Sequence, residues 1–297
     1  MPKAPRRGLD GVLLLDKPVG PSSSAVLQAV KRLLGAHKAG HAGTLDPMAS
    51  GLLPLLFGEA TKFAQFGLDA AKEYVADVRL GVATETGDAE GRETERRPVE
   101  VDDESLARAL AGFRGSIEQV PPMYSALKHE GQPLYALARA GQTVARQPRP
   151  VTVHALELLQ RGPDLLRLRV LCSKGTYVRQ LAVDLGEALG TVAHLQALRR
   201  TAVGALRLDQ AVSLDDLQAL GEEGRRAWLQ PADRLLEQLP RVELDEPLAA
   251  RFLQGQAVRP GSVRPGPCRV YAAGALLGVG EGTPEGNLQP ARLVARA

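Results

Sequence analysis

Three stretches of the chain alternate apolar and polar side chains, and this limits the fold to one built on a half-exposed sheet. The alternation covers residues 74–80, 151–159 and 165–172. Alternation with a period of two is typical of strands with one face in the core and the other in solvent. Residues 11–15 are apolar without interruption, as expected of a strand that is buried on both faces. The chain should therefore form a sheet from strands that lie far apart in the sequence.

Two other stretches repeat apolar residues at helical spacing, so helices should accompany this sheet. The first follows Ser22 and Ser23, either of which can cap it, and Gly35 can end it. The second covers residues 176–189. Between the first helix and the next apolar run, residues 36–51 hold too many structure-breaking residues for a helix or a strand, and we expect a loop there.

Proline positions and a change of composition indicate how the chain is divided. Residues 121–150 begin and end with prolines and interleave tyrosines with basic side chains, which predicts an excursion from the main body. After Pro240 the sequence has short strands rich in glycine and proline, including a tight hairpin near residues 273–274. We therefore expect a large domain over residues 1–242 and a small β-rich domain over residues 243–297.

The composition excludes several classes of protein. Of the 297 residues, 44% are hydrophobic and 24% are charged, which is ordinary for a globular chain and excludes disorder throughout. The apolar runs at residues 12–15 and 52–57 are too short for a signal peptide or a membrane span. The two cysteines, Cys172 and Cys268, lie far apart, so no disulfide framework is expected. These features predict a soluble protein of the reducing cytoplasm.

The distribution of charge leaves two interpretations open. The net charge is only +3, but residues 1–38, 128–179 and 247–297 are basic whereas residues 69–105 and 207–246 are acidic. The basic segments could converge on one face and meet a polyanion. They could equally be scattered over a solvated surface.

The usual motifs of metal and nucleotide sites are missing from the sequence. The five histidines show no ligand spacing and accompany no cysteine pair, so we expect no metal. No glycine-rich phosphate loop follows a strand, and we expect no nucleotide cofactor. What remains is the glycine-rich segment 40–47, in which Pro47 restricts the backbone of Asp46 and so holds its carboxylate in place. Such an Asp-Pro pair suits a nucleophile, although most of them are only turns.

A set of ordered motifs favours the nucleophile over the ordinary turn as the interpretation of Asp46. Around them the sequence resembles the TruB family of tRNA pseudouridine synthases over essentially its whole length. The motifs are residues 11–18 with the serines that follow, residues 40–47 and then 51–62, Lys72-Glu73-Tyr74, Pro122 to Lys128, Ser173 to Arg179, and Leu198-Arg199-Arg200-Thr201. Two departures, Ala42 and Ser24, replace a threonine and an asparagine that are common in the family. Neither departure changes a residue that carries chemistry.

The resemblance implies a fold and a division of labour along the chain. The fold class is α+β, the pseudouridine synthase fold, with a mixed and mostly antiparallel sheet flanked by helices. Residues 121–150, which we call the thumb segment, would be the insertion that grips RNA. Residues 243–297 would form a small PUA-like RNA-binding β domain.

The resemblance also implies an activity and its site. The enzyme would isomerise uridine to pseudouridine in the T loop of tRNA, at uridine-55, with no cofactor and no obligate protein partner. Asp46 would be the catalytic carboxylate, and Arg179 would pair with it, because a carboxylate in a dry pocket needs a partner to stay ionised. Tyr74 would stack on the flipped base and accept its C5 proton. The other expected contacts are Tyr177 and Leu198 as pocket walls, His41 in the space that the base vacates, and Lys17, Lys62 and Asp88 as supports of the Asp46 segment.

Binding of tRNA would need many phosphate contacts. Basic residues in the thumb segment and in the last motif are the expected donors, and affinity should fall steeply with salt. They are Lys128, Arg139, Arg146, Arg149, Arg199 and Arg200.

Two other functions remain as alternatives. A non-catalytic RNA chaperone could fold tRNA with the same surfaces. A hydrolase with an aspartate nucleophile would need a metal or a second carboxylate beside Asp46, and the sequence offers neither at a recognisable spacing.

Overall fold

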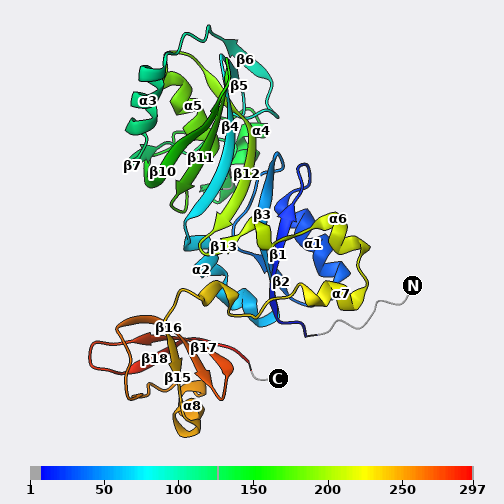
Figure 1. Ribbon diagram of the computed structural model, residues 1–297, viewed down its shortest axis with the longest axis vertical. Helices are drawn as coiled ribbons and strands as arrows, with labels where there is room; N and C mark the ends of the chain where they lie inside the picture. Colours follow the sequence, from blue (N-terminus) through cyan, green and yellow to red (C-terminus); the bar gives the residue numbers. More distant parts are fainter. Residues whose placement is uncertain (1–7, 126, 296–297) are drawn as a thin grey trace.

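The computed structural model describes residues 8–125 and 127–295, and its main feature is one long mixed sheet (Figure 1). Most neighbouring strands are antiparallel, while β1 pairs with β14 and β3 pairs with β12 in parallel. Two short strands, β2 (Ala39–His41) and β13 (Leu206–Arg207), add to β3 and β12. In order across the sheet the strands are β14 (Val212–Ser213), β1 (Gly11–Lys17), β3 (Ala49–Phe57), β12 (Ala193–Val203), β4 (Lys72–Leu80), β11 (Leu165–Cys172), β10 (Arg149–Arg161) and β7 (Gly115–Gln119).

The two halves of this sheet meet where β3 and β12 run side by side over only three residue pairs, Leu198 to Arg200 against Ala49 to Gly51. The approach is so close that a Cβ on Gly51 would lie 2.3 Å from the carbonyl oxygen of Arg200. Gly51 also has a φ of +102°, which side chains rarely tolerate. Glycine at this position therefore permits the two half-sheets to join.

Helices cover one face of each half-sheet, as Figure 1 shows for α1, α3 and α5. In the upper half, α5 (Val178–Ala188) and α3 (Asp103–Gly112) contribute to the same buried cluster as the inward residues of β4, β10 and β11. In the lower half, α1 (Ser23–Leu33) buries Val26, Leu27 and Val30 against β1 and β3. Ser22 caps α1 by accepting a hydrogen bond from the amide of Ala25.

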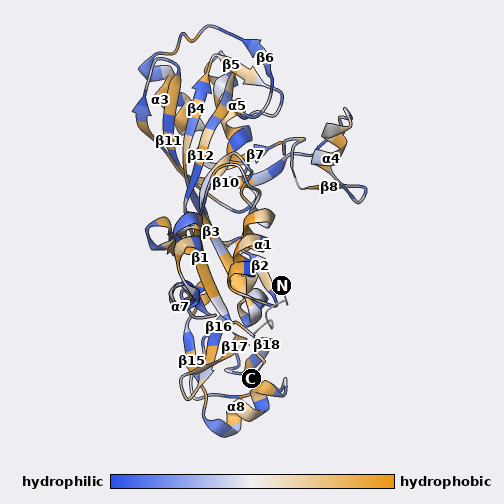
Figure 2. Ribbon diagram, turned by 90° about the vertical axis from the view of Figure 1, so that its right-hand side faces the viewer, coloured by the Kyte–Doolittle hydropathy of each residue, from blue (hydrophilic) through white to orange (hydrophobic). Residues whose placement is uncertain are grey.

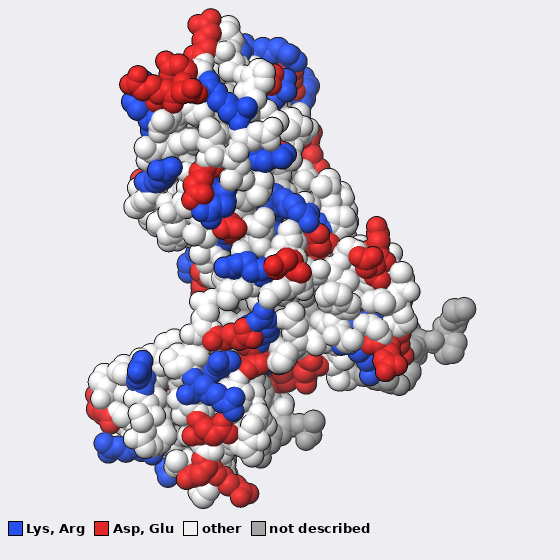
Figure 3. Space-filling model, viewed as in Figure 1, with Lys and Arg blue, Asp and Glu red and all other residues white. Residues whose placement is uncertain are grey.

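Ion pairs occupy outward positions of the upper half-sheet. Arg167 forms two hydrogen bonds of 2.7 and 2.8 Å with Asp77 on the next strand. Arg169 pairs with Glu73 and Glu157 on either side. Basic and acidic side chains are accordingly interleaved on the face drawn in Figure 3, rather than gathered into one basic surface. On this face the charges are scattered over the surface, which is the second of the two interpretations that the sequence left open.

The thumb segment leaves the body of the protein between β7 and β10. It contains β8 (Lys128–His129), β9 (Gln132–Pro133) and the short helix α4 (Leu134–Arg139). Figure 2 shows β8 and α4 projecting away from the sheet. Most of the described residues from 140 to 150 are exposed, so this part of the chain adds little to the core.

A second, four-stranded sheet lies at the other end of the molecule (Figure 1). Its hairpin turns through Ala273 and Gly274, which both have positive φ. A small cluster that includes Phe63, Leu236 and Val279 joins it to the main body. Its elements are β15 (Arg241–Glu243), α8 (Glu246–Leu253), β16 (Gly266–Ala272), β17 (Ala275–Gly282) and β18 (Leu288–Leu293).

The remaining elements are short and lie in the connections. No helix among the described residues is both long and apolar enough to cross a membrane. These elements are η1 (Gly58–Phe63), α2 (Ala64–Asp69), β5 (Val82–Thr84), β6 (Glu93–Arg96), η2 (Leu208–Gln210), α6 (Leu214–Ala219), α7 (Glu222–Ala227) and η3 (Arg234–Leu236).

The predicted fold class is confirmed, and two predictions made within it are wrong. Residues 36–51 are not all loop, because β2 and the start of β3 lie within them; pairing with the long central strand overrides the local glycines. Lys62 does not support the Asp46 segment. It donates instead to the carbonyl oxygen of Leu293, 2.8 Å away, and thereby ties η1 to the second sheet.

Candidate active site

The Asp46 loop, residues 42–48, lies between β2 and β3 beside the junction of the two half-sheets. The buried hydroxyl of Ser23 accepts a hydrogen bond from the amide of Leu45 at 2.8 Å and donates to its carbonyl at 2.9 Å. On the other side of Asp46, the amide of Gly20 donates to the carbonyl of Pro47 at 2.8 Å. Lys17, which is fully buried, donates to the carbonyl of Ala49 at 2.8 Å. The loop is therefore held on both sides of its carboxylate.

Asp46 forms an ion pair with Arg179, as the resemblance implied. An oxygen of the carboxylate lies 2.6 Å from a terminal nitrogen of the guanidinium. The side chain of Arg179 is only 8% exposed, and its Nε lies 3.2 Å from the buried carboxylate of Asp88. Arg179 therefore joins two carboxylates and orients the exposed one against the buried one. Asp88 supports the site through Arg179 rather than through the loop itself.

Asp46 is more exposed to solvent than expected, because the sequence analysis assumed a carboxylate in a dry pocket. The side chain of Asp46 is 47% exposed, because one side contacts Arg179 and the other lines an open cavity of about 290 Å³. Tyr74, Tyr177 and Leu198 line the same cavity, and all three are half-buried. The structure thus brings together five residues that the resemblance associates with catalysis and base binding, although they come from four separate parts of the sequence.

Burial changes the proton affinity of the two tyrosines in this cavity. It raises the pKa of Tyr74, and the nearby Arg200 guanidinium partly opposes that rise. Burial also raises the pKa of Tyr177. Both phenols are therefore neutral at physiological pH.

His41 occupies a different position from the pocket residues. It is half-buried at the end of β2, two residues before Gly43, and is not one of the residues that line the cavity. Its Nδ1 is buried and has no hydrogen-bond partner among the described residues. Burial and the charge of Arg200 lower the pKa of the ring, which is therefore neutral and suited to stacking.

One of the predicted phosphate contacts is wrong. Arg200 is 1% exposed and donates to the backbone carbonyls of Leu52, Gly43 and Thr44 at 2.7, 3.0 and 3.4 Å. Its neighbour Arg199 is exposed and lies 2.6 Å from Asp16. Consecutive residues of a strand point to opposite faces, so only one member of this arginine pair can meet solvent.

The other predicted RNA contacts lie in or near the thumb segment. Arg149 is exposed at the start of β10. Arg146 is half-buried and donates to the carbonyl of Pro121 at 3.0 Å. The side chains of Lys128 and Arg139 lie outside the part of the chain that the structure describes.

Two supporting residues were missed by reasoning from the sequence. Ser23 resembled a helix cap, but Ser22 takes that role and leaves Ser23 free to hold Leu45. Gln119 is buried and bonds both the amide and the carbonyl of Tyr177, at 2.8 and 3.1 Å. A serine cluster and a single strand glutamine give no signal of such long-range contacts.

Lys72 is a further cation in the cavity wall. It is buried and donates to the carbonyls of Leu68 and Ala70 at 2.5 and 2.6 Å, near the end of α2. Burial, reinforced by the charge of Arg200, lowers its pKa to about 8. The sequence placed Lys72 inside a motif without giving it a role.

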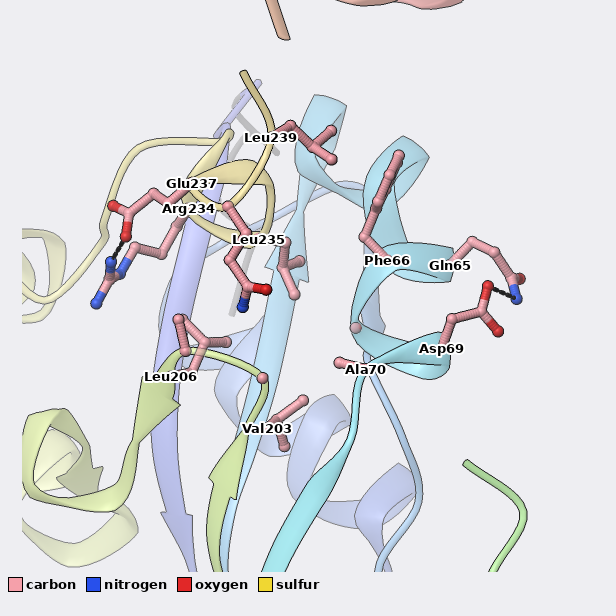
Figure 4. A pocket seen from close by; sticks show the side chains of 14 residues that line it. Gln65, Phe66, Asp69, Ala70, Val203, Leu206, Arg234, Leu235, Glu237 and Leu239 are labelled. Atoms are coloured by element: carbon pink, nitrogen blue, oxygen red, sulfur yellow. Dashed lines mark hydrogen bonds and ion pairs between the residues drawn. The ribbon is translucent and has the colours of Figure 1, made fainter. Parts of the chain in front are cut away.

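A larger cavity of about 440 Å³ lies between α2 and η3 (Figure 4). Its charged side chains are already paired with others: Arg234 contacts Glu237, and Asp69 accepts from Gln65. Leu206, Phe66 and Leu239 supply apolar walls. The cavity beside Asp46 instead combines a carboxylate, an arginine that also contacts the buried Asp88, and two tyrosines, and it is the better candidate for the active site. Among the described residues, no three histidine, cysteine or acidic side chains are grouped as metal ligands.

Comparison with known families covers nearly the whole chain. Residues 31–178 match the family described as TruB family pseudouridylate synthase (N terminal domain). Residues 179–237 match the tRNA pseudouridylate synthase B C-terminal domain, and residues 240–294 match Pseudouridine synthase II TruB, C-terminal. These three matches follow one another along the chain.

Curated relatives agree with these families. A protein of Aromatoleum aromaticum named tRNA pseudouridine synthase B is 57% identical over 98% of this chain and 94% of its own length. A protein of Burkholderia lata with the same name is also 57% identical, over 100% of this chain and 94% of its own.

Solved structures share the fold. The match in a Cbf5-Nop10-Gar1 complex has a TM-score of 0.71 at 30% identity and covers 92% of this chain and 78% of that one. A match in an H/ACA RNP bound to a substrate RNA containing 2'-deoxyuridine has a TM-score of 0.73 at 26% identity, covering 96% of this chain and 85% of that one. Sequence motifs, fold and site geometry agree, and the chain belongs to the TruB family of pseudouridylate synthases.

Proposed function

We propose that this enzyme converts uridine to pseudouridine in tRNA, and that its target is uridine-55 of the T loop. The observation that carries the proposal is the Asp46–Arg179 ion pair of 2.6 Å in a cavity that Tyr74 also lines. The curated relatives named tRNA pseudouridine synthase B support the choice of tRNA. The position within tRNA follows from the family resemblance of the motifs.

The proposed reaction needs only groups that this cavity holds. The bond from N1 of uracil to the ribose breaks, the freed base turns, and a new bond forms from C5 to the same ribose carbon. The C5 proton leaves and N1 gains a proton, so no atom is added and nothing is oxidised. Asp46 would start the reaction by attacking the ribose or the base, or by promoting loss of a ribose proton, while Arg179 holds its carboxylate in place through their ion pair.

Tyr74 would receive the flipped base and accept its C5 proton. Its ring lies on β4 in the wall of the cavity, which suits stacking on a base that has left the RNA helix. Because the raised pKa leaves this phenol neutral, it can accept the C5 proton only as it gives up its own, and N1 of the freed base is the atom that must gain one; a nearby positive charge would stabilise the phenolate between the two transfers. The Arg200 guanidinium supplies that charge.

The RNA would approach along the groove at the base of the thumb segment. A cavity of about 460 Å³ adjoins the one beside Asp46, and Leu68, Gly175 and Tyr177 line both. Arg149 and Lys174 line the outer cavity and can meet phosphates. We further propose that residues 1–242 form the catalytic domain, that residues 243–297 form a PUA-like domain extending the RNA contact, and that the enzyme works in the cytoplasm without an obligate protein partner.

The substitution Asp46→Asn tests the proposal directly. It keeps the size of the side chain but removes the charge, so single-turnover formation of pseudouridine should fall by about 10⁴-fold or more while tRNA affinity stays within about twofold. The measurement is release of tritium from tRNA labelled at C5 of uridine, with the modified position mapped by sequencing. Retained turnover in the variant would remove Asp46 from the mechanism, and a different modified position would reject uridine-55.

The same experiment separates the two alternatives. An RNA chaperone would give the same amount of pseudouridine, namely none, with either version of the protein. A hydrolase would need a second carboxylate at the substrate. Asp88 shares Arg179 with Asp46, but it is buried and is not among the residues that line the cavity.

A further inference from the structure

Arg200 is a buried cation without a carboxylate partner, and the sequence had assigned it to the surface. Among the described residues no ion pair joins it to an acidic side chain, although it is 1% exposed. Burying an unpaired charge is costly, and folded proteins tolerate it only where hydrogen bonds satisfy the group. The burial of Arg200 therefore needs a structural or functional explanation.

Three strands meet at this residue. In the register of the sheet, Arg200 lies opposite Gly51 of β3 on one side and opposite Tyr74 of β4 on the other. The Nε of Arg200 donates a hydrogen bond of 2.7 Å to the carbonyl of Leu52, which fixes the guanidinium to β3. The planar fork then points its terminal nitrogens toward the Asp46 loop.

Those terminal nitrogens hold the first half of the Asp46 loop. They donate to the carbonyls of Gly43 at 3.0 Å and Thr44 at 3.4 Å, three and two residues before Asp46. Gly43 has a φ of +112°, and a Cβ there would lie 3.4 Å from a nitrogen of Arg200, so the glycine lets the loop pass close to the guanidinium. Ser23 holds Leu45 on the same side of Asp46, while the amide of Gly20 and the ammonium of Lys17 hold Pro47 and Ala49 on the other side.

The same guanidinium lies beside Tyr74, its partner in the register of β12 and β4, and both side chains line the cavity next to Asp46. Its positive charge acts to lower the pKa of three neighbours. For Tyr74 this opposes the effect of burial, and for His41 and Lys72 it adds to the effect of burial. One side chain thus bonds the backbone of the nucleophile loop and lies beside the aromatic group proposed to take up the C5 proton.

We propose that Arg200 is a positioning residue of this active site, which sets the Asp46 loop and the Tyr74 phenol relative to each other and stabilises negative charge on that phenol. The proposal rests on the proposed function. A phosphate contact is the rival interpretation of the same residue, and it predicts a different pattern of changes.

Kinetics of two variants test the positioning. Arg200→Lys keeps the charge but cannot bridge the three carbonyls of Leu52, Gly43 and Thr44, because an ammonium lacks the planar fork. Arg200→Met removes both the charge and the hydrogen-bond donors. The single-turnover rate should fall roughly 10-fold in the first and roughly 100-fold or more in the second, with tRNA affinity changed by less than about threefold.

The matched control is Arg167→Met, an exposed arginine on β11 paired with Asp77. It should leave both rate and affinity unchanged. If the Arg200 variants instead weaken tRNA binding, lower the salt dependence by about one charge and keep the rate, Arg200 is a phosphate contact and the proposal is wrong. If Arg200→Met fails to fold, Arg200→Lys decides between the same two outcomes.

Titration of Tyr74 tests the charge effect without using activity. The groups that face the phenol are the Arg200 guanidinium, the Cys172 thiol and the Asp46 carboxylate. Tyrosine labelled with ¹³C at Cζ reports the tyrosinate, and Tyr74→Phe identifies the signal. The midpoint for Tyr74 should move to higher pH in Arg200→Met and stay close to the native value in Arg200→Lys.

Failure of the Arg200 proposal can be distinguished from failure of the proposed function. An unchanged midpoint in Arg200→Met would overturn the proposal even if pseudouridine is formed. If the native enzyme forms no pseudouridine, the proposed function fails, and a shifted midpoint would still show that Arg200 acts on Tyr74.

Discussion

The Asp46 loop and the thumb segment both lack long regular elements, yet they are held in opposite ways. Around the Asp46 loop, Ser23, Lys17 and Arg200 bond to backbone groups on both sides of the carboxylate, and Arg179 bonds to the carboxylate itself. These four side chains belong to α1, β1, β12 and α5. Four separate elements therefore set the position of a single oxygen.

In the thumb segment, several hydrogen bonds stay within the segment. The amide of Leu134 donates to the carbonyl of Leu127, and Arg146 donates to the carbonyl of Pro121. Contact with the body comes near the start of the segment, where Tyr124 bonds Glu85 and its carbonyl accepts from Arg179. An irregular segment can thus be a rigid support for chemistry or an exposed arm for binding, depending on how many elements hold its backbone.

The largest effect that tests this contrast is expected from Arg179→Ala. The change frees Asp46 and leaves the buried carboxylate of Asp88 without a cation. The single-turnover rate should fall by about 10²–10³-fold, and unfolding should become easier by about 3 kcal/mol. Rapid-quench kinetics and urea denaturation measure the two effects.

Two comparisons make that result specific. Arg199→Ala removes an exposed arginine from the neighbouring part of β12 and should weaken tRNA binding with a much smaller loss of rate. Equal rate losses in both variants would reduce Arg179 to a phosphate contact. Arg179→Lys should recover part of the stability, because it keeps a cation near Asp88.

A smaller effect is expected from Ser23→Ala, which removes one hydroxyl at the edge of the Asp46 loop. Two backbone groups of Leu45 then lose their partner in a buried place, at a cost of about 1–3 kcal/mol. The carboxylate next in the chain should lose alignment, and the rate should fall roughly 10-fold. Thermal unfolding and single-turnover kinetics measure both quantities.

Ser22→Ala is the matched control for that change. Its hydroxyl caps α1 through Ala25 and contacts no part of the loop. It should cost about 1 kcal/mol of stability and leave the rate intact. Equal rate losses in the two serine variants would show that the loop is held by other contacts.

The smallest effect is expected from Arg149→Ala, at the exposed end of the thumb segment. The affinity for tRNA should fall by about three- to tenfold, the salt slope should decrease by about one, and stability should change by less than about 0.5 kcal/mol. Binding titrations at several salt concentrations measure the slope. Arg108→Ala on α3, where an exposed arginine pairs with Glu104, is the control. A rate loss at saturating tRNA would mean that the thumb segment also positions the site.

Much of the fold could be predicted because the relevant signals are local. Alternation along residues 165–172 and helical spacing along residues 176–189 follow directly from which side of an element meets the core. The prediction went wrong at β2 and at Lys62. At β2, pairing with β3, the next strand along the chain, overrides the local glycines; at Lys62, the deciding partner, Leu293, belongs to another sheet.

The sequence by itself determined the family, the strands and helices, and the identity of Asp46, Tyr74 and Arg179 as candidate catalytic residues, because motifs and periodicity are properties of neighbouring residues. Only the tertiary structure decided which of two adjacent arginines is buried, which of two adjacent serines holds Leu45, and that Asp88 shares Arg179. Those choices depend on where strands from distant parts of the chain meet. A buried charge or hydroxyl is stable only where that meeting supplies its hydrogen-bond partners.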